Sequence, residues 1–417
     1  MNQAIKSALL IHYYFPPIHS IGVLRNFYLA KELHNRIDTV KILTTSNQNI
    51  LPSSPMNGLE AMDVSILKTK DYRSNRGKAM HFDEKKKKSA LFQFARRMID
   101  SYPFNIWMGE GGSNYIKEGI KKGTEFLYKN PQALIFTSFR PYADIYIGAQ
   151  LKKKFPESRW VVDFRDLHVD PMYKNVNFPN FQIRKNKKLL SKAEFITTIS
   201  NGLGRKLNKY NKEVITIYNG IHHRTEKQEK SNKFNICYTG SLFGNKRDPS
   251  PLFKWLKDQG GVFDLDDIEI HYAGKDGALF SEYISKYGLD KNYTNHGMVS
   301  HDKAKELQEK SHINLLLTSV TKGHEGVLTG KLFEYLGGTS PILAIVKGGK
   351  DNELEKILEQ TKTGVVISED GQWQSDFVSW YRAWENNEPY LINHQNVESL
   401  FSWENSVNII LAKLENI

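Results

Sequence analysis

The chain has 417 residues, of which 40% are apolar, so it is long enough for two domains with hydrophobic cores and is not a disordered protein. Its single cysteine, Cys237, cannot form an intrachain disulfide, and no Cys/His cluster has the spacing of zinc ligands. These cysteine and histidine positions predict a protein without a structural metal. The chain has no signal-peptide pattern at its start and no run of about 18 apolar residues, which predicts a cytoplasmic protein without a membrane span.

The net charge of +12 is unevenly divided along the chain. Residues 1–222 contain 36 Lys and Arg against 18 Asp and Glu, whereas residues 223–417 contain 22 against 28. A basic first half joined to an acidic second half indicates that only the first half meets a polyanion. That polyanion would be either a nucleic acid or an anionic membrane surface.

Short apolar runs, most of them succeeded by a helical pattern, recur through the first half. Residues 22–36 and 141–155 are two of these helical patterns. Strands that alternate with helices and are buried on both faces are typical of a parallel sheet, so the first half is predicted to be a doubly wound α/β domain. The predicted strands are 7–15, 39–46, 62–69, 133–139, 159–166, 195–200 and 214–220.

The same pattern returns after a polar segment at 222–233, which is predicted to be a linker. The last 15 residues carry one apolar stripe, at 407, 410, 411 and 414, as a terminal helix would. The sequence therefore predicts two Rossmann-like domains with a cleft at the carboxyl ends of their strands, where ligands bind in open α/β sheets. The predicted strands of the second half are 234–241, 268–274, 294–299, 313–320, 341–346 and 364–368.

The stretch HEGVLTGKLFEYLGGTSPILAIV, residues 324–346, begins in a loop after a predicted strand and then opens a helix. Gly326 and Gly330 let the backbone approach a ligand, and the first turn of the helix, with Lys331, would attract a phosphate. Glu334 lies on the same helix face and could accept hydrogen bonds from the two hydroxyls of a ribose. These residues predict a nucleotide clamp, and the alternative is an exposed ion pair between Lys331 and Glu334.

A second loop, YTGSLFGNKRDPSPL at 238–252, also comes after a predicted strand. It contains Gly240 and the adjacent cations Lys246 and Arg247 ahead of a predicted helix. This loop could supply further positive charge to the same diphosphate.

Seven motifs from about residue 8 to the C-terminus together resemble the GT-B glycosyltransferases of glycosyltransferase family 4. In chain order they are YFPPIHSIGVLRNFYLAKEL, VVDFRDLHVDP, AEFITTISNGLGRKL, VITIYNGI, CYTGSLFGNKRDP, HYAGKD and GVLTGKLFEYLGGTSPILA. The resemblance implies an acceptor-binding domain at 1–222, completed by a terminal helix at about 403–417 that crosses back to it. It also implies a domain at 223–402 that binds a nucleotide sugar.

The resemblance also assigns roles to individual residues. Lys331 with Lys246 or Arg247 would hold the diphosphate near Gly240, and Glu334 would bind the ribose. The backbone amides around Leu328, Thr329 and Gly330 would face the diphosphate and the donor sugar. In the first domain Ser20, Gly22 and Arg25, on the loop after the first strand, would close over donor and acceptor.

The chain departs from the family pattern at two places. Eight residues before Glu334, where the family often has a second glutamate, stands Gly326, with Glu325 one position out of register. Where many members have a His-Asp pair, this chain has Arg165 and Asp166, and His168 lies two positions further on. Both departures concern residues that would contact the donor sugar or the acceptor.

Sugar transfer from a nucleotide sugar requires that the leaving diphosphate be neutralised, which fixed cations can do in place of a metal. We therefore expect no metal and no cofactor, only a UDP- or GDP-linked donor. Asp166, beside Arg165, is the candidate catalytic base. The resemblance favours retention at the anomeric carbon, in which case Asp166 would position the acceptor. The alternative is that Asp163 and Asp166 pair with Arg165 or cap a loop.

Residues 83–109 combine a run of four lysines, Arg96 and Arg97 with four aromatic side chains. Basic residues beside exposed aromatics suit the headgroup region of an anionic bilayer, which would carry a lipid-linked acceptor. The basic segments 151–155 and 183–190 could add to this surface. The alternative is that the aromatics belong to the core. The four aromatics are Phe92, Phe94, Phe104 and Trp107.

The leading hypothesis is a glycosyltransferase of cell-surface polysaccharide synthesis that acts on the inner face of the cell membrane, with a saccharide or lipid-linked acceptor. A nucleotide-sugar epimerase of the same fold and a non-catalytic scaffold that binds nucleotide sugars are the alternatives. Nucleic-acid binding is disfavoured, because the lysine runs are scattered over several elements and the clamp residues lie in the acidic half.

Overall fold

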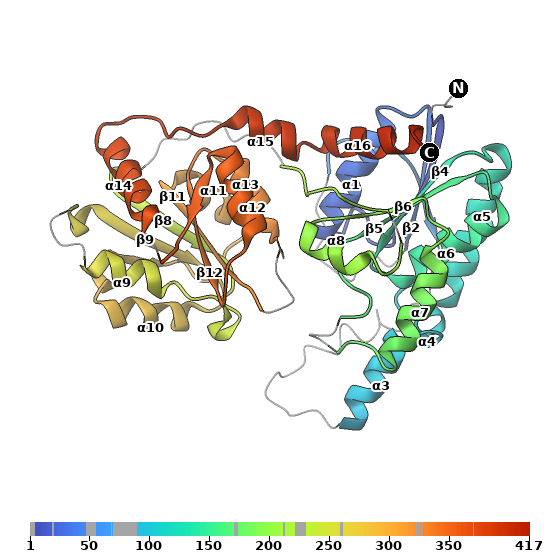
Figure 1. Cartoon of the computed structure of the whole chain (residues 1–417), viewed down its shortest axis with the longest axis horizontal. Coiled ribbons are helices and arrows are strands. Elements are labelled where there is room, and N and C mark those ends of the chain that lie inside the picture. The colour runs from blue at the N-terminus through green and yellow to red at the C-terminus, as the bar shows by residue number, and fades with distance from the viewer. Residues whose placement is uncertain are drawn as a thin grey trace. The chain divides into compact units, whose positions relative to one another are not determined.

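The computed structural model divides into two compact units (Figure 1). Unit 1 consists of Met1–Asn219 and Trp403–Ile417, and unit 2 of Gly220–Ser402. Most of the predicted linker lies outside the described residues. The structure describes residues 5–18, 21–46, 56–67, 69, 90–170, 174–211, 213–221, 231–258, 262–321, 326, 328–369 and 371–417.

Unit 1 contains a 7-stranded parallel sheet in its described residues, with the strand order β3-β2-β1-β4-β5-β6-β7. The order reverses between β1 and β4, and the carboxyl edge at such a switch point is where open α/β sheets bind ligands. The strands are β1 (Ser7–Ile11), β2 (Thr39–Thr45), β3 (Asp63–Leu67), β4 (Leu134–Phe139), β5 (Arg159–Phe164), β6 (Phe195–Thr198) and β7 (Val214–Thr216).

Helices cover both faces of this sheet. Strand β1 shows why: Leu9 and Ile11 belong to the core under α5 and α6, whereas Ala8 and Leu10 belong to the core under α1 and α16. A strand buried on both faces has no polar alternation, which is the pattern that predicted a parallel sheet. The helices are α1 (Ile21–His34), α3 (Ala90–Asp100), α4 (Phe104–Trp107), α5 (Gly112–Lys129), α6 (Tyr142–Lys154), α7 (Pro179–Leu190), α8 (Asn201–Leu207) and α16 (Trp403–Glu415).

Unit 2 contains a 6-stranded parallel sheet in its described residues, with the order β10-β9-β8-β11-β12-β13. Here the order reverses between β8 and β11, so their carboxyl ends are the second switch point. The strands are β8 (Phe234–Thr239), β9 (Ile268–Ala273), β10 (Tyr293–Asn295), β11 (Ile313–Ser319), β12 (Ile342–Lys347) and β13 (Gly364–Val366).

The helices of unit 2 also lie on both faces of its sheet (Figure 1). The core under α9 and α14 is aromatic, with Trp255 packed edge-on against Trp373 and Phe377 at 4.9 Å between ring centroids. The helices are α9 (Ser250–Asp258), α10 (Gly277–Tyr287), α11 (His301–Lys310), α12 (Gly330–Leu336), α13 (Asn352–Thr361), α14 (Gln372–Glu385) and α15 (His394–Phe401).

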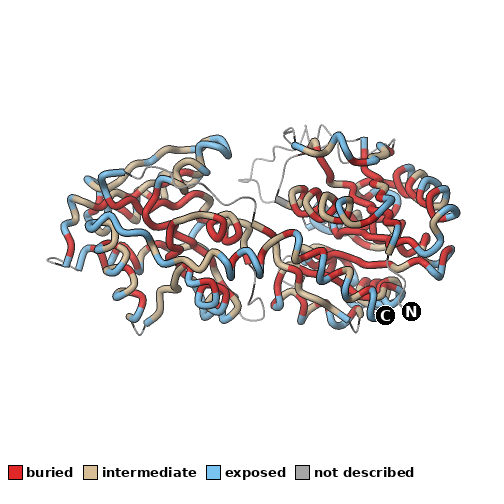
Figure 2. Tube along the Cα trace, turned by 90° about the horizontal axis from the view of Figure 1, so that it is seen from above, coloured by how far each residue is buried: buried red, intermediate tan, exposed pale blue. Residues whose placement is uncertain are grey.

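Two doubly wound parallel sheets confirm the predicted fold class, and each predicted strand has a counterpart. The predictions extend too far at the strand ends. Residues 12–15 were included in the first strand because they are apolar, but they come after β1, and Tyr13 and Phe15 are buried as core side chains. Figure 2 shows buried residues gathered in the interior of each unit and exposed residues around its outside. None of the described helices has the length and apolar character needed to span a bilayer.

The last helix of the chain, α16, packs in unit 1 against α1, as predicted (Figure 1). The Trp403 ring stacks on Tyr28 with 5.5 Å between centroids, and Val407 and Ile410 are buried beneath. The chain thus contributes its final residues to the core of the first unit.

Ile410→Ala should test how strongly α16 is held. Ile410 is fully buried, so we expect the free energy of unfolding of unit 1 to fall by about 2–5 kcal/mol. Its neighbour Ile409 is 38% exposed, and Ile409→Ala should change that free energy by less than about 0.5 kcal/mol. Urea unfolding monitored by circular dichroism measures both, and equal losses would contradict the observed packing.

Candidate functional site

At the carboxyl edge of the unit 2 sheet, the side chain of Lys331 on α12 lies across Gly240, the residue directly after β8. A Cβ placed on Gly240 would lie 2.7 Å from Cε of Lys331, and Gly240 has a φ of +146°. A side chain there would therefore be strained and would also push Lys331 away. The parallel pairing of β8 with β11 brings these two segments together.

Lys331 is half-buried and makes no hydrogen bond or ion pair with another described residue. In particular it does not pair with Glu334, which is half-buried on the next turn of α12. The alternative of an ordinary surface ion pair is therefore not observed. Behind the lysine, burial raises the pKa of the Cys237 thiol to about 12, although Lys331 opposes the shift, so this cysteine is an unreactive core residue.

The loop after β8 is held in place by β9 and the residues just beyond it. The Tyr272 hydroxyl donates to the Gly240 carbonyl at 2.9 Å and accepts from the Asp276 amide at 2.9 Å. The Asp276 carboxylate in turn accepts from the Leu242 amide at 2.7 Å. The backbone that Lys331 crosses is therefore fixed before any ligand arrives.

The two predicted cations of this loop differ in their surroundings. Arg247 donates to the Ser241 carbonyl at 3.0 Å, and its guanidinium lies 4.6 Å from the ring centroid of the exposed Phe243. Lys246 is exposed. Arg247 is thus a positioned cation, whereas Lys246 would have to be ordered by a ligand.

The helix predicted to open in the stretch 324–346 is α12, which begins at Gly330 after the N-cap residue Thr329. The Thr329 hydroxyl is buried and has no hydrogen-bond partner among the described residues, and Leu328 beside it is buried. The helix has 7 residues, so its dipole is short and Lys331 contributes most of the positive charge here.

Two other predicted site residues, Ser20 and Glu325, lie outside the described part of the chain.

The prediction that Gly22 and Arg25 lie on the loop after the first strand is wrong, because both belong to helix α1. Arg25 is buried there and forms a two-pronged ion pair with Asp163 of β5. The Nε and Nη2 atoms donate to the carboxylate at 2.9 and 2.7 Å, and the Thr197 hydroxyl donates to it at 2.7 Å. Burial alone would raise the pKa of Asp163, but Arg25 and Thr197 outweigh it and the pKa is lowered. Arg25 also donates to Asn219 at 3.2 Å, so it joins α1, β5 and the end of unit 1.

Arg165 and Asp166 lie directly after β5 at the same edge of the sheet. A Cβ placed on Gly22, in the first turn of α1, would overlap Nη1 of Arg165. No ion pair joins Arg165 to Asp163 or Asp166 among the described residues, because Asp163 is paired with Arg25. Asp166 is exposed. The structure therefore places Arg165 near Gly22, Arg25 and Asp166, and the roles of all four stay predictions.

His168 is buried and both of its ring nitrogens are hydrogen bonded. Nε2 lies 3.1 Å from the Asp100 carbonyl and Nδ1 lies 2.8 Å from the amide nitrogen of Asn186. Burial lowers its pKa, so the neutral ring donates to Asp100 and accepts from Asn186. In this arrangement His168 joins α3 to α7, and its predicted contact with a sugar stays a prediction.

His12, directly after β1, was not predicted as a site residue. It is fully buried, and neither ring nitrogen has a hydrogen-bond partner among the described residues. Burial lowers its pKa to about 3, with opposing effects from Asp163 and Arg165, so the ring is neutral. Its place at the carboxyl end of β1, next to the switch point, is the sequence signal that could have identified it.

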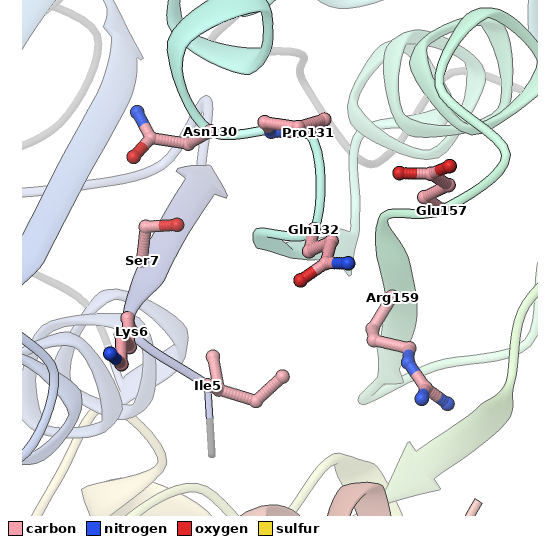
Figure 3. A pocket seen from close by; sticks show the side chains of 8 residues that line it. All are labelled: Ile5, Lys6, Ser7, Asn130, Pro131, Gln132, Glu157 and Arg159. Atoms are coloured by element: carbon pink, nitrogen blue, oxygen red, sulfur yellow. The ribbon is translucent and has the colours of Figure 1, made fainter. Parts of the chain in front are cut away.

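A pocket in unit 1 lies at the opposite, amino edge of the sheet (Figure 3). Ser7 and Arg159 begin β1 and β5, and Gln132 precedes β4. An Asp-x-Asp sequence can bind a metal ion, and unit 2 has one, Asp264 to Asp266. It comes just before β9, so it lies at the amino edge of the sheet, and the Asp264 carboxylate accepts a hydrogen bond from the Asp266 amide at 2.9 Å. Among the described residues, no group of three or more His, Cys, Asp and Glu side chains could hold a metal ion.

The sequence matches no protein-family model and no curated protein sequence. Solved structures share its fold over nearly the whole chain. Anabaena HepE, solved with UDP and glucose, has a TM-score of 0.57 and 11% identity and covers 99% of this chain and 100% of its own. The lipopolysaccharide outer core galactosyltransferase WaaB has a TM-score of 0.54 and 11% identity, and the match covers 99% of this chain and 100% of WaaB. A Listeria monocytogenes protein proposed to be a UDP-N-acetylglucosamine 2-epimerase has a TM-score of 0.50 and 10% identity, and the match covers 99% of this chain and 96% of that protein. The chain therefore has the two-domain Rossmann-like GT-B fold.

Arg25→Ala should show how much the buried ion pair stabilises unit 1. The substitution leaves the Asp163 carboxylate buried without its counter-ion, and we expect a loss of about 3–5 kcal/mol in the free energy of unfolding. Lys122→Ala removes an exposed ion pair with Glu125 and should leave the urea midpoint nearly unchanged. If Arg25→Ala unfolds at the wild-type urea concentration, the pair does not stabilise the unit.

Proposed function

We propose that this chain is a glycosyltransferase that moves a sugar from a UDP- or GDP-linked donor to a saccharide or lipid-linked acceptor in cell-surface polysaccharide synthesis. The observation that carries the proposal is Lys331, a cation without a partner among the described residues, held across Gly240 at the switch point of unit 2. A half-buried ammonium group beside a pre-formed loop is a site that an anionic ligand would complete.

The described residues of unit 2 fit the parts of a nucleotide diphosphate. Lys331 and Arg247 would neutralise the diphosphate as it leaves, and because the loop already holds Arg247, no reorganisation is needed at that moment. Glu334, one turn further along α12 and unpaired among the described residues, would accept hydrogen bonds from the ribose hydroxyls. Two cations supply the charge that a metal ion would otherwise contribute.

In the proposed reaction the bond between the anomeric carbon and the donor phosphate breaks, and a bond to the acceptor oxygen forms. With retention, the proton of the acceptor hydroxyl passes to an oxygen of the departing diphosphate. Asp166, exposed at the carboxyl end of β5, would then orient the acceptor hydroxyl, and in an inverting reaction it would take the proton itself.

Two of the solved structures that share the fold support the choice of donor and pathway. HepE was solved with UDP and glucose, and WaaB is a galactosyltransferase of the lipopolysaccharide outer core. The fold likeness to the proposed epimerase favours an epimerase as the second candidate, since an epimerase would use the same nucleotide site. A non-catalytic scaffold would also bind the nucleotide but would not consume it.

Lys331→Ala and Glu334→Ala should abolish stabilisation by the nucleotide. A ligand at a hundredfold excess over its dissociation constant stabilises a folded protein by about 2.7 kcal/mol, so UDP or GDP should raise the melting temperature of the wild type. The matched control is Lys356→Ala, which removes an exposed lysine on α13 and should keep the wild-type shift. Equal shifts in all four proteins would contradict the proposed clamp.

Mass spectrometry of the reaction products separates the three candidate functions. A glycosyltransferase consumes the nucleotide sugar in proportion to added acceptor and yields a new glycoside. An epimerase converts the donor without acceptor, and a scaffold binds it and leaves it unchanged.

We further propose that unit 1 docks on the anionic inner face of the cell membrane through helix α3. None of the residues of α3 is buried, and Leu91 is 77% and Phe94 43% exposed. The same helix carries Arg96 and Arg97, and Figure 1 shows it projecting from the sheet of unit 1. Phe92, Phe94 and Trp107 are exposed, so the alternative that the aromatics belong to the core does not hold for these three; Phe104 is half-buried.

Helix α7 extends this surface. The side chain of Asn177, two residues before α7, donates to the carbonyl of Phe94 on α3 at 3.0 Å, and this hydrogen bond connects the start of α7 to α3. Phe181 of α7 is 44% exposed, with the Lys185 ammonium 5.4 Å from its ring centroid. Apolar side chains beside cations suit the headgroup region, where each cation contributes about 1 kcal/mol.

Leu91→Asp should weaken binding to vesicles that contain phosphatidylglycerol. The substitution places a carboxylate where an apolar side chain would enter an anionic surface. Leu391→Asp in unit 2 changes a leucine that is 90% exposed and should bind like the wild type. Co-sedimentation measures both, with phosphatidylcholine vesicles as the uncharged reference, and equal binding of the two variants would argue against docking through α3.

A further inference from the structure

Arg165 has the carboxylates of Asp163, Asp166 and Asp144 near it, but it forms an ion pair with none of them. Its Nε atom is buried without a hydrogen-bond partner, and the residue makes no ion pair with any other described residue. Burial lowers the pKa of its guanidinium, which means that the charged form is poorly solvated where it lies. Arg165 as a whole is half-buried, and a guanidinium partly withdrawn from water normally has an anion beside it.

The carboxylates around Arg165 attract it electrostatically, but none of them pairs with it directly. Asp163 already accepts three hydrogen bonds, two from Arg25 and one from Thr197. Burial raises the pKa of Asp144 well above its usual range, although Tyr13 and Tyr115 donate to it, so this carboxyl tends to be neutral. Asp166 is exposed and forms no ion pair with Arg165.

The position of the guanidinium adds a second reason to expect an anion. Nη1 of Arg165 lies against Gly22 in the first turn of α1, a helix of 14 residues with no acidic residue in that turn. The first amides of a helix have no partners within the helix and carry a partial positive charge, so a cation beside them is unfavourable by itself. An oxyanion between the two would accept hydrogen bonds from both.

The neutral His12 extends this polar region into the interior. Its buried ring has two nitrogens without a partner among the described residues, and its pKa responds to the charges of Asp163 and Arg165. Gly22 has a specific role here, because any side chain at this position would displace the guanidinium.

We propose that unit 1 has its own oxyanion site, in which the Arg165 guanidinium at Gly22 binds a phosphate group of a substrate. The chemical class is a phosphate monoester or a diphosphate. Under the proposed function, on which the identity of the substrate rests, the phosphate belongs either to the nucleotide sugar or to a phosphorylated acceptor. The site is distinct in its residues from the one formed by Lys331 and Gly240.

Isothermal titration of the full chain with inorganic pyrophosphate tests this site. Two sites are expected in the wild type, one of which is lost in Lys331→Ala and the other in Arg165→Gln, with a weakening of about tenfold or more for losing a charged hydrogen bond. Arg159→Gln is the matched control, since Arg159 lies on the same strand at the opposite edge, and it should keep both sites. Wild-type titration of Arg165→Gln would overturn the proposal.

Gly22→Ala provides a second variant in case Arg165→Gln does not fold. Alanine suits a helix and keeps the charge of Arg165 but pushes its guanidinium aside, so the same site should be lost. A folded Gly22→Ala that retains both pyrophosphate sites would also overturn the proposal.

Two further titrations identify the source of the phosphate. If it is the donor, Arg165→Gln weakens UDP binding. If it is the acceptor, UDP binding is unchanged and decyl phosphate no longer binds to the UDP-saturated variant, although it binds to the UDP-saturated wild type. If Lys331→Ala leaves UDP binding intact while Arg165→Gln still loses its pyrophosphate site, the proposed function fails and the oxyanion site stands.

Discussion

The close approach of Lys331 to Gly240 is the contact on which the candidate donor site depends. It requires two strands that are far apart in the sequence to pair in parallel, so that the loop after β8 and the helix after β11 meet at one edge. It also requires a residue without a side chain at a φ of +146°. Tyr272 and Asp276 then fix the loop, so the cation faces a backbone that is already ordered. Electrostatic stabilisation of a leaving diphosphate is most effective when the cations are in place beforehand.

The two units place positive charge at the carboxyl edges of their sheets by different means. In unit 2, Lys331 lies without a partner among the described residues while Arg247 is held by backbone oxygen and an aromatic ring. In unit 1, Arg25 pairs with the buried carboxylate of Asp163, which is held in its charged form. Arg165 is attracted to Asp163 and Asp166 but forms no ion pair with any described residue. Removing one member of a buried pair such as Arg25 and Asp163 is costly because the other charge stays buried, but the whole pair gains little over apolar residues of the same shape, so its positioning effect is the more important consequence.

The fold was predictable because parallel strands buried on both faces appear as short apolar runs. The Lys331–Gly240 site was partly predictable, since a glycine loop and a helix with a lysine both came after strands at a switch point. The partner of Arg25 was not predictable, because Asp163 lies 138 residues away and the sequence offered Arg165 as an equally reasonable partner. For His12, the position directly after the first strand was visible in the sequence, but the lack of a hydrogen-bond partner for both ring nitrogens among the described residues is a property of packing. The exposure of α3 also depends on the elements that pack against it, so the sequence left core and surface interpretations open.

Hydrogen exchange of the full chain with and without UDP reports which backbone amides a nucleotide protects, and so tests whether Lys331 and Gly240 bind it. A nucleotide bound there slows exchange in peptides that cover residues 238–249 and 328–336, the loop after β8 and the helix α12. It leaves exchange unchanged around Ser7 and Arg159 at the amino edge of unit 1. Unchanged exchange in both unit 2 segments at saturating UDP and GDP would contradict the claim that Lys331 and Gly240 form a nucleotide site.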